Sequence, residues 1–434
     1  MKIMIDGMNL ALEQGTGVAT YARNLASCVR RLGFELTTLY GKPAPLRGDP
    51  VLREAMLVDD APQRRSAARW TADLARSLAP VAPTAVPETG HVLREQRRLQ
   101  FPPCDATWNW PHLFHTANAR FLTTGRLLEV VAPEPVDVAH WTYPVPIRVR
   151  GAKNVYTFHD LVPLKLPYAT LDRKKRYWRL ISTLARQADH LVTVSECSRR
   201  DIVDMLRVPP EKVTNTHQSV AIPRRLLGVA EADVAVELAH AFHAPLVEAA
   251  AGELARLEPR GFYLFLGAIE PKKNLRRLLE AYLASGVPEP LVVVGRRGWS
   301  YEEEVKMMER SPRVLYLDYL PFGQVITLLR SARALLWPSL YEGFGLPILE
   351  AFLCGSPVVT AKGSATEEIA GGAALLVDPY DPREIRDAIR RLSAEGGDAL
   401  RAELVEKGRA RAEDFDEARI APRVEAVYRR VLAG

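Results

Sequence analysis

Long apolar runs are missing from this sequence of 434 residues, in which no stretch of 18 or more uncharged apolar residues occurs. A transmembrane helix needs about 20 such residues, so we expect no membrane span. The N-terminal residues Met1–Asp6 read as the start of a strand and lack the apolar core of a signal peptide. These absences favour a cytoplasmic protein that contacts a membrane peripherally, at the inner face, if at all.

Cysteine is also scarce, and its spacing argues against two kinds of site. The four cysteines (Cys28, Cys104, Cys197 and Cys354) are far apart and form no C-x-x-C pair. This spacing indicates reduced thiols rather than a zinc site or a disulfide framework. No D-x-D motif follows a predicted strand, so no motif nominates a metal site. The sequence also shows no helix-turn-helix, zinc-finger or RNP-like pattern, so we expect no nucleic-acid partner.

Charge is present but unevenly placed. Residues 1–225 hold 32 Lys and Arg against 21 Asp and Glu, whereas the rest of the chain holds 26 against 31. One predicted helix, Asp172–Arg186, contains the basic run Arg173–Arg176. Such a run is usually a solvated surface, but a basic half also suits an anionic partner. Among anionic partners we favour the headgroups of a membrane.

The length suits two domains of about 200 residues each. In the second half, six apolar runs alternate with helical patterns, which is typical of a doubly wound parallel sheet. These runs are Phe262–Ala268, Leu291–Gly295, Val314–Tyr319, Ala334–Pro338, Pro357–Ala361 and Ala374–Asp378. The Ala-rich segment Ala221–Pro259 is expected to be a helical crossover between the domains.

Residues 43–135 are the least regular part of the chain, because prolines interrupt them repeatedly. Trp108 and Trp110 lie there in a predicted proline-rich loop. Aromatic side chains in a loop can stack on sugars, although packing is the commoner reason for them.

Residues 339–357 read S-L-Y-E-G-F-G-L-P-I-L-E-A-F-L-C-G-S-P and lie between two of the apolar runs. Pro347 suits the first turn of a helix, and Gly355 suits a left-handed cap at its end. This places Glu342 in the preceding loop and Glu350 in the first or second turn. The two loop glycines leave backbone amides open to a ligand, and amides at a helix start favour anions and hydroxyl oxygens. The two carboxylates either accept hydrogen bonds from a sugar or are ordinary solvated glutamates.

The nonapeptide E-G-F-G-L-P-I-L-E at 342–350 resembles the E-x7-E motif of the retaining GT-B glycosyltransferases of glycosyltransferase family 4. The resemblance implies an α/β GT-B fold, in which two Rossmann-like doubly wound parallel-sheet domains face each other across a cleft. It also implies that Glu342 contacts the transferred sugar and that Glu350 holds the nucleotide ribose. The backbone amides that would face the donor diphosphate belong to Phe344, Gly345 and Leu346.

Two segments of the first half also resemble this family. Gly15, Thr16 and Gly17 link the first predicted strand to a helix, either as a simple turn or as a phosphate-binding loop. The family places a similar loop against the donor diphosphate. His159 and Asp160 follow a predicted strand, where open α/β sheets bind ligands. A histidine can donate and accept hydrogen bonds near neutral pH, and the neighbouring Asp can orient it.

The segment G-A-I-E-P-K-K-N at 267–274 resembles the G-x-x-E-P-[RK]-K-N segment of the family. Lys272 and Lys273 precede a predicted helix and would hold a diphosphate as point charges. Many members of the family carry Arg directly after the glycine, whereas this sequence has Ala268. Lys272 or Arg296 is therefore expected to supply the second cation.

The resemblance covers residues 1–42, 136–220 and 262–432, and it implies how the chain divides. Residues 1–220 would bind the acceptor, and residues 221–418 would bind the nucleotide-sugar. A last helix, residues 419–434, would return to the first domain.

The expected reaction is the transfer of a hexose, with retained configuration, from a nucleotide-diphosphate sugar to a hydroxyl of a glycan or lipid-linked glycan. We place it in the synthesis of a bacterial surface polysaccharide. Similarity to bacterial mannosyltransferases of the family favours GDP-mannose as donor. His159, Glu342 and Lys273 are the expected catalytic residues, with no cofactor and no required metal. Two alternatives remain, namely a nucleotide-sugar epimerase of the same fold and a non-catalytic sugar-binding or assembly subunit.

Overall fold

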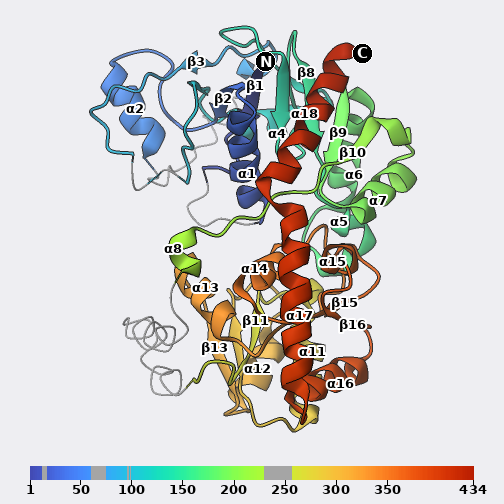
Figure 1. The fold of residues 1–434 in the computed structure, drawn as a ribbon. Helices are drawn as coiled ribbons and strands as arrows, with labels where there is room; N and C mark the ends of the chain where they lie inside the picture. Colours follow the sequence, from blue (N-terminus) through green and yellow to red (C-terminus); the bar gives the residue numbers. More distant parts are fainter. Residues whose placement is uncertain (12–16, 60–74, 95–96, 98, 229–256) are drawn as a thin grey trace.

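The computed structural model describes residues 1–11, 17–59, 75–94, 97, 99–228 and 257–434. Gly15, Thr16 and most of the predicted crossover Ala221–Pro259 lie outside the described residues. Two sheets organise the described chain, one in each lobe of the molecule (Figure 1).

The first sheet has eight strands in the spatial order β10-β9-β8-β6-β1-β2-β4-β3. Neighbouring strands pair in parallel except β3 and β4, which are antiparallel. Ile3, Met4 and Ile5 of the central strand are fully buried, as expected of a parallel strand covered on both faces. The strands are β1 (Lys2–Asp6), β2 (Glu35–Tyr40), β3 (Thr84–Ala85), β4 (Ala106–Asn109), β6 (Val138–Trp141), β8 (Lys153–Thr157), β9 (His190–Thr193) and β10 (Val213–Asn215).

The second sheet has six strands, all parallel, in the order β13-β12-β11-β14-β15-β16. Each of the six apolar runs in the second half of the sequence forms one of them. They are β11 (Tyr263–Leu266), β12 (Leu291–Val294), β13 (Val314–Leu317), β14 (Ala334–Trp337), β15 (Val358–Ala361) and β16 (Leu375–Val377). The predicted α/β fold with two parallel-sheet domains is confirmed.

Helices connect the strands. The main ones are α1 (Gly17–Arg31), α2 (Pro50–Val58), α4 (Leu113–Thr124), α6 (Lys174–Gln187), α7 (Glu196–Leu206), α11 (Leu275–Ser285), α12 (Glu302–Glu309), α13 (Phe322–Ser331), α14 (Leu346–Cys354), α15 (Ala365–Ala370), α16 (Pro382–Ser393) and α17 (Gly397–Ala412). A third, two-stranded sheet lies in the first lobe and pairs β5 (Leu128–Val130) with β7 (Ile147–Val149). Within the described ranges, no helix is both long and apolar enough to cross a bilayer.

The last helix, α18 (Glu417–Ala433), packs against α1, so the chain ends on the lobe in which it begins (Figure 1). The Tyr428 hydroxyl in α18 lies 2.7 Å from Nδ1 of His140 in β6. Nε2 of the same histidine lies 2.8 Å from Oγ1 of Thr157 in β8. The last helix therefore supports the strand that ends two residues before His159.

The prediction of a loop is wrong for Trp108 but holds for Trp110, and neither side chain is exposed. Trp108 is in β4 with 2% of its surface exposed, and Trp110 directly follows that strand with 6% exposed. Both side chains belong to the core of the first domain. The reason is that β4 pairs with β2 inside the sheet, where large apolar side chains fill the space beside the strand. Neither ring is free to stack on a sugar.

Candidate active site

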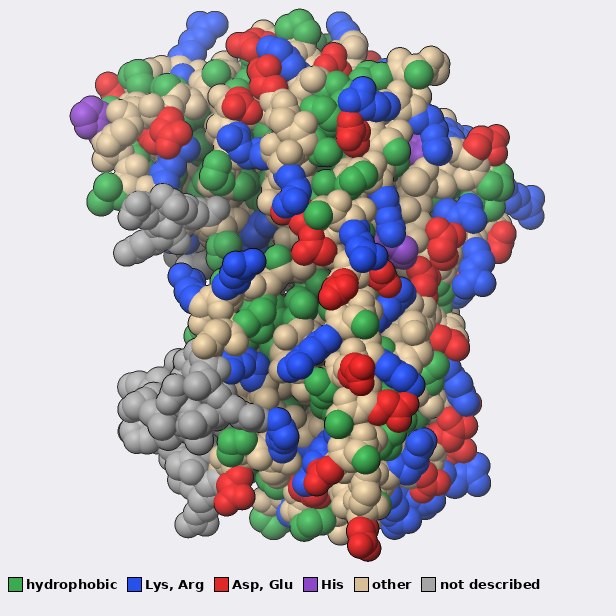
Figure 2. Space-filling view, viewed as in Figure 1, with side chains coloured by type: hydrophobic (Ala, Val, Ile, Leu, Met, Phe, Trp, Pro, Cys, Tyr) green, Lys and Arg blue, Asp and Glu red, His purple; other side chains and the backbone are tan. Residues whose placement is uncertain are grey.

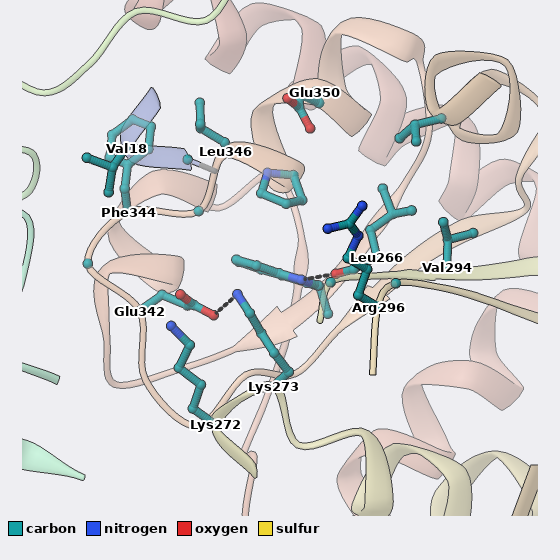
Figure 3. A pocket seen from close by; sticks show the side chains of 18 of the residues that line it. Val18, Leu266, Lys272, Lys273, Val294, Arg296, Glu342, Phe344, Leu346 and Glu350 are labelled. Carbon is teal, nitrogen blue, oxygen red and sulfur yellow. Dashed lines mark hydrogen bonds and ion pairs between the residues drawn. The ribbon is translucent and has the colours of Figure 1, made fainter. Parts of the chain in front are cut away.

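A cavity of about 480 Å³ lies between the two domains and is lined by residues of both. Its walls include residues that follow strands β8, β11, β12, β13 and β14, and the carboxyl ends of parallel strands are where open α/β sheets bind ligands. The cavity brings together the residues nominated as catalytic or donor-binding that the structure describes. These are Gly17, His159, Asp160, Lys272, Lys273, Glu342, Phe344, Gly345, Leu346 and Glu350. Figure 3 labels Lys272, Lys273, Glu342, Phe344, Leu346 and Glu350 among them.

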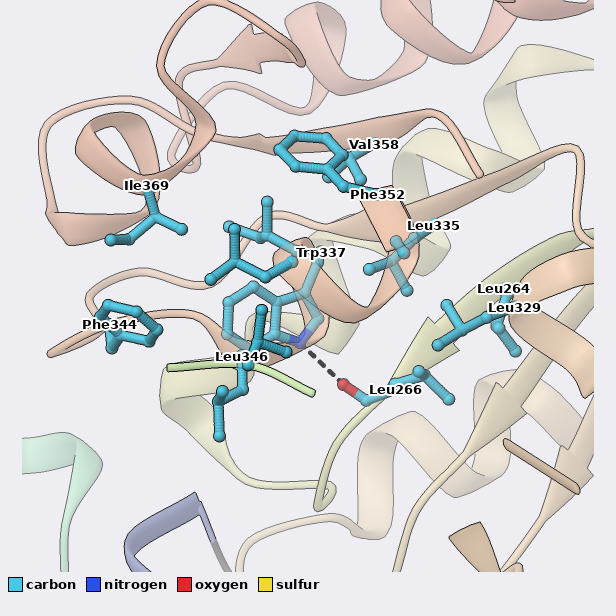
Figure 4. Close-up of a cluster of buried hydrophobic side chains, with 14 of the residues drawn as sticks. Leu264, Leu266, Leu329, Leu335, Trp337, Phe344, Leu346, Phe352, Val358 and Ile369 are labelled. Atoms are coloured by element: carbon cyan, nitrogen blue, oxygen red, sulfur yellow. Dashed lines mark hydrogen bonds between the residues drawn. The ribbon is translucent and has the colours of Figure 1, made fainter. Parts of the chain in front are cut away.

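Lys273 and Glu342 form an ion pair in this cavity, with 2.6 Å between Nζ and Oε1 (Figure 3). Lys273 ends a short 3-10 helix, Pro271–Lys273, whereas Glu342 lies in the loop before α14. The ammonium also lies 4.6 Å from the centre of the Trp337 ring. The indole N–H of Trp337 donates a 2.7 Å hydrogen bond to the carbonyl of Leu266, which fixes the ring in the core (Figure 4). Lys273 is thus held between a carboxylate and an aromatic face.

The two lysines keep Glu342 ionised. Burial alone would raise the pKa of Glu342, but Lys273 and Lys272 beside it lower that pKa below its usual value. Burial likewise acts to lower the pKa of Lys272, yet the neighbouring carboxylates Glu342, Glu270 and Asp160 raise it above its usual value. Lys272 also lies 3.4 Å from Glu270. The cavity therefore holds fixed charges of both signs at neutral pH.

Glu350 lies in the second turn of α14, as predicted, and lines the cavity. Its carboxylate makes no hydrogen bond or ion pair with the rest of the described chain, and burial raises its pKa to about 7. Burying a carboxylate without a partner is costly. A carboxylate in this state suits a site that receives hydroxyl donors from a ligand.

Glu350→Gln should stabilise the protein at pH 8 and weaken nucleotide binding. Between the usual pKa of 4.5 and the folded value of about 7, the folded state binds more protons than the unfolded state, so stability falls as the pH rises. Gln removes this penalty, and each kcal/mol recovered raises the Tm by roughly 2–4 °C. If Glu350 binds the ribose of a nucleotide, as the resemblance implies, the lost charged hydrogen bond should weaken nucleotide binding about 10- to 100-fold. Thermal unfolding at pH 5 and pH 8, with titration of nucleoside diphosphates, measures both. A lower Tm than the parent at pH 8 would contradict this interpretation.

His159 is oriented by backbone contacts in the first domain. Its Nε2 donates to the carbonyl of Thr142 at 2.9 Å, and the amide of Thr142 donates to the buried carboxylate of Asp6 at 2.5 Å. The ring of Tyr21 meets the imidazole edge-on at 4.8 Å. Because burial lowers the pKa of His159 to about 4, the ring is neutral at pH 7 and Nδ1 is an acceptor. His159 can therefore accept a hydrogen bond from a sugar hydroxyl.

Asp160 and Gly343 mark a close contact between the domains. A Cβ on Gly343 would lie 2.6 Å from the carbonyl oxygen of His159 and 2.8 Å from Cβ of Asp160. No other residue type allows this approach without moving the backbone. The Asp160 carboxylate accepts a hydrogen bond from the amide of Val162 at 3.0 Å, so this side chain also shapes the turn that carries His159.

The start of α14 faces the start of α1 across the cavity, since a Cβ on Gly17 would lie 3.8 Å from Cδ1 of Leu346. Gly345 precedes α14 with a φ of 126°, a conformation that favours glycine. Pro347 lies in the first turn and Gly355 forms the left-handed cap at the end, as predicted. The open amides at the start of α14 thus point to a place for an anion.

Both candidates for the second cation line the cavity. The guanidinium of Arg296 lies 4.8 Å from the centre of the Tyr319 ring. In Figure 3, Lys273 lies between Lys272 and Arg296, so positive charge extends along this wall of the cavity.

Sequence reasoning missed Asp318, Tyr319 and Trp337, which also line the cavity. Asp318 and Tyr319 directly follow β13, so the strand-end rule that nominated His159 would have found them. Trp337 ends β14 and carries no signal beyond its place in an apolar run. Over the part of the chain that the structure describes, no three His, Cys, Asp or Glu side chains are grouped so as to hold a metal ion.

Two family models match the chain, one in each half. The model described as Glycosyltransferase Family 4 matches residues 15–220, and the model described as Glycosyl transferases group 1 matches residues 248–411. The chain is 32% identical over 277 residues to O-antigen chain mannosyltransferase B of Escherichia coli, a match that covers 61% of this chain and 67% of that protein. The chain belongs to glycosyltransferase family 4.

This family 4 glycosyltransferase also resembles a relative along nearly its whole length. It is 30% identical over 460 aligned residues to the MMP alpha-(1->4)-mannosyltransferase of Mycolicibacterium hassiacum, which covers 96% of this chain and 95% of that protein. Among solved structures, HepE of Anabaena in complex with UDP and glucose superposes with a TM-score of 0.63 at 16% identity, covering 98% of this chain and 99% of that chain. The expected GT-B fold is confirmed. Family 4 enzymes retain the anomeric configuration, so the reaction class is retaining hexosyl transfer.

Proposed function

We propose that this glycosyltransferase moves mannose from GDP-mannose to a hydroxyl of a glycan or lipid-linked glycan, in the synthesis of a bacterial surface polysaccharide. The observation that carries the proposal is that Lys272, Lys273 and Arg296 meet the carboxylates of Glu342 and Glu350 in one cavity between the domains. Cations suit a diphosphate, and carboxylates suit the hydroxyls of a sugar and a ribose.

Charge placement accounts for the chemistry. When the bond between the sugar carbon and the phosphate oxygen breaks, negative charge grows on the diphosphate. The ammonium of Lys273 has three N–H donors, one of which Glu342 uses, so it can also bind this charge together with the amides at the start of α14. The acceptor hydroxyl attacks from the same face and gives its proton to the departing phosphate. Glu342 and His159 hold the sugar during this step.

Two observations favour GDP-mannose among possible donors. The relatives in Escherichia coli and Mycolicibacterium hassiacum are both named as mannosyltransferases. The exposed carboxylate of Asp318 lines the cavity. A carboxylate can accept hydrogen bonds from both N1–H and N2–H of guanine, whereas uracil offers a single N–H.

A panel of nucleotide-sugars screened for slow hydrolysis tests this proposal. We expect GDP-mannose to be hydrolysed fastest and to release mannose with retained configuration. Asp318→Asn should reduce the preference for GDP-mannose over UDP-sugars by about 10-fold, because one charged acceptor is lost. Hydrolysis of none of the donors would favour the non-catalytic subunit, and conversion of one nucleotide-sugar into another would favour the epimerase.

Donor hydrolysis should survive chelation of divalent metals. In this proposal the phosphate charge is met by Lys273 and by helix-start amides. We expect the rate after dialysis against EDTA to stay within about two-fold of the untreated rate, a change below 0.5 kcal/mol in the barrier. Loss of turnover with EDTA and its recovery with Mg²⁺ or Mn²⁺ would show that a metal carries the charge instead.

We also propose that the first domain binds an anionic membrane surface peripherally. On the face seen in Figure 2, Lys and Arg side chains are interspersed with acidic ones, so net charge alone defines no surface there. The segment around the start of α6 is a better candidate for the membrane-binding surface than net charge alone indicates. Leu171 and Trp178 are 73% and 45% exposed there, near the exposed cations Arg173 and Lys175 in the sequence. Apolar and basic side chains side by side suit the interface of an anionic bilayer.

The double variant Arg173→Gln/Lys175→Gln should bind anionic vesicles about 10- to 30-fold more weakly, since each cation near such a surface contributes about 1 kcal/mol. Lys174 and Arg176 are unsuitable targets, because they donate to Thr170 and Asn118. Co-sedimentation with neutral and anionic vesicles measures binding, and near 1 M salt should reverse it.

The charge-matched control for this test is Lys306→Gln/Arg310→Gln, which changes two exposed cations at α12 in the other domain. The control should bind as the parent does. Equal binding of the parent to neutral and anionic vesicles, or binding to neither, would rule out the membrane proposal.

A further inference from the structure

The loop that carries Glu342 is also held from the opposite side of the cleft. Tyr341 points its hydroxyl into the first domain, where it donates a hydrogen bond to Asp201 of α7 and lies 3.1 Å from Sγ of Cys197. Burial raises the pKa of the Cys197 thiol, so the thiol stays protonated and donates to the tyrosine oxygen. Lys165 completes the group, 2.6 Å from Asp201 and 4.6 Å from the centre of the Tyr341 ring.

Further contacts join the second domain to the first turn of α7. The hydroxyl of Ser198 donates to the carbonyl of Gly343 at 3.3 Å. The carboxylate of Glu368 accepts the backbone N–H groups of Glu196 and Cys197 at 2.8 and 2.9 Å, which places a negative charge at the start of the helix. An apolar cluster surrounds the tyrosine and contains side chains of both domains, namely Val162, Leu166, Ala169, Cys197, Leu340, Tyr341 and Ala365.

We propose that Tyr341 is a positioning residue for glycosyl transfer, which locks the Glu342 loop onto α7 when the two domains close. The residue before Tyr341 donates its backbone N–H to the carbonyl of Lys272 at 2.8 Å, and the residue after it pairs with Lys273. The tyrosine therefore lies in the middle of the segment that sets the position of the Glu342 carboxylate. Because Asp201 belongs to the first domain, its hydrogen bond exists only when the domains are together. Closure of the two domains therefore also sets the position of the Glu342 carboxylate.

Tyr341→Phe removes the hydroxyl and keeps the ring, so it tests this role without emptying the core. We expect kcat to fall about 10- to 100-fold, the effect of a lost hydrogen bond to a charged group. The Kd for GDP should change less than about three-fold, since the nucleotide contacts lie mainly in the second domain. The matched control is Tyr282→Phe, whose hydroxyl bonds to the carbonyl of Glu289 at 2.7 Å within the second domain. It should leave kcat unchanged.

Asp201→Asn should reproduce the kinetic defect. The double variant with Tyr341→Phe should be no slower than either single variant, because both changes remove the same hydrogen bond. Independent, additive losses would overturn the proposal. An equal loss of kcat in the Tyr282→Phe control would also overturn it, since any tyrosine hydroxyl would then have the same effect.

The kinetic test rests on the proposed function, but labelling of Cys197 does not. The thiol is buried beside Tyr341 at the interface, so N-ethylmaleimide reaches it only when the domains separate. Mass spectrometry should show Cys197 alkylated at least about 10-fold faster in Tyr341→Phe, as its closed state loses a charged hydrogen bond. Cys104, which is partly exposed and lies in the first domain away from α7, should react at the parent rate. An unchanged rate at Cys197 would overturn the proposal even if every donor proved inactive.

Discussion

Glu342→Gln is expected to lower turnover by about two to three orders of magnitude, the usual cost of removing a group that stabilises charge in the transition state. In our proposal Glu342 touches the sugar whose charge changes during the reaction. The substitution preserves the shape of the side chain but removes the charge 2.6 Å from Lys273. Lys273 is then freer to bind phosphate, so GDP should bind as tightly as before, or more tightly.

Single-turnover rates and GDP titration separate these two effects. The matched control is Glu304→Gln, which changes another buried glutamate of the second domain, in α12, whose pKa burial raises. The control should keep normal turnover. Equal and small losses in turnover and in GDP affinity for Glu342→Gln would refute the role assigned to this residue. A Glu342→Gln enzyme that loses mainly nucleotide binding, which is the result expected for Glu350→Gln, would refute it as well.

Lys273→Gln should be at least as damaging, because the side chain has two partners. Loss of the ammonium removes a charged contact to the diphosphate, which should weaken GDP binding about 10- to 100-fold. Burial of Glu342 acts to raise the pKa of its carboxyl group, and Lys273 and Lys272 lower that pKa. The substitution removes Lys273, the nearer of these two cations. The pKa of Glu342 should therefore be higher in this variant than in the parent, so the carboxylate ionises at a higher pH, and kcat/KM should fall by about 10²- to 10³-fold.

The pH profile distinguishes this explanation from simple misfolding. Over the pH range in which the rate of the parent enzyme does not change, the residual rate of Lys273→Gln should rise with pH. A higher pH ionises the Glu342 carboxyl group again. Lys407→Gln, on the exposed surface of α17, is the control and should behave as the parent. A Lys273→Gln enzyme with normal GDP affinity would contradict the proposed contact with the diphosphate.

Much of the site was predictable because its signals are local. Glycine and proline around Glu342 and Glu350 determine where α14 begins and ends within a few residues. Alternating apolar runs and helical patterns predict parallel strands, and the carboxyl ends of parallel strands meet at one edge of the sheet. These two rules, together with the resemblance of both segments to the family, nominated His159 and Lys273 for the same site, although they are far from the Glu342 motif in the chain.

The position predicted for Trp108 was wrong because its strand, β4, was not recognised. Trp108 was assigned to a loop because prolines surround it, yet β4 pairs with β2 inside the sheet and buries the ring. Short strands in a proline-rich region carry too little periodic signal to reveal their neighbours. The pairing of β4 depends on contacts with a strand about 70 residues earlier in the chain, which no local pattern contains.

The sequence by itself indicated the family through motifs that resemble it, the two α/β domains through periodicity, and many but not all of the residues that line the cavity. Only the tertiary structure decided what those residues do to one another. The bond from Lys273 to Glu342 spans 69 positions and that from Tyr341 to Asp201 spans 140, and the raised pKa of Glu350 comes from burial alone. Such contacts depend on how two sheets pack across a cleft, and packing is a property of the whole fold rather than of any segment.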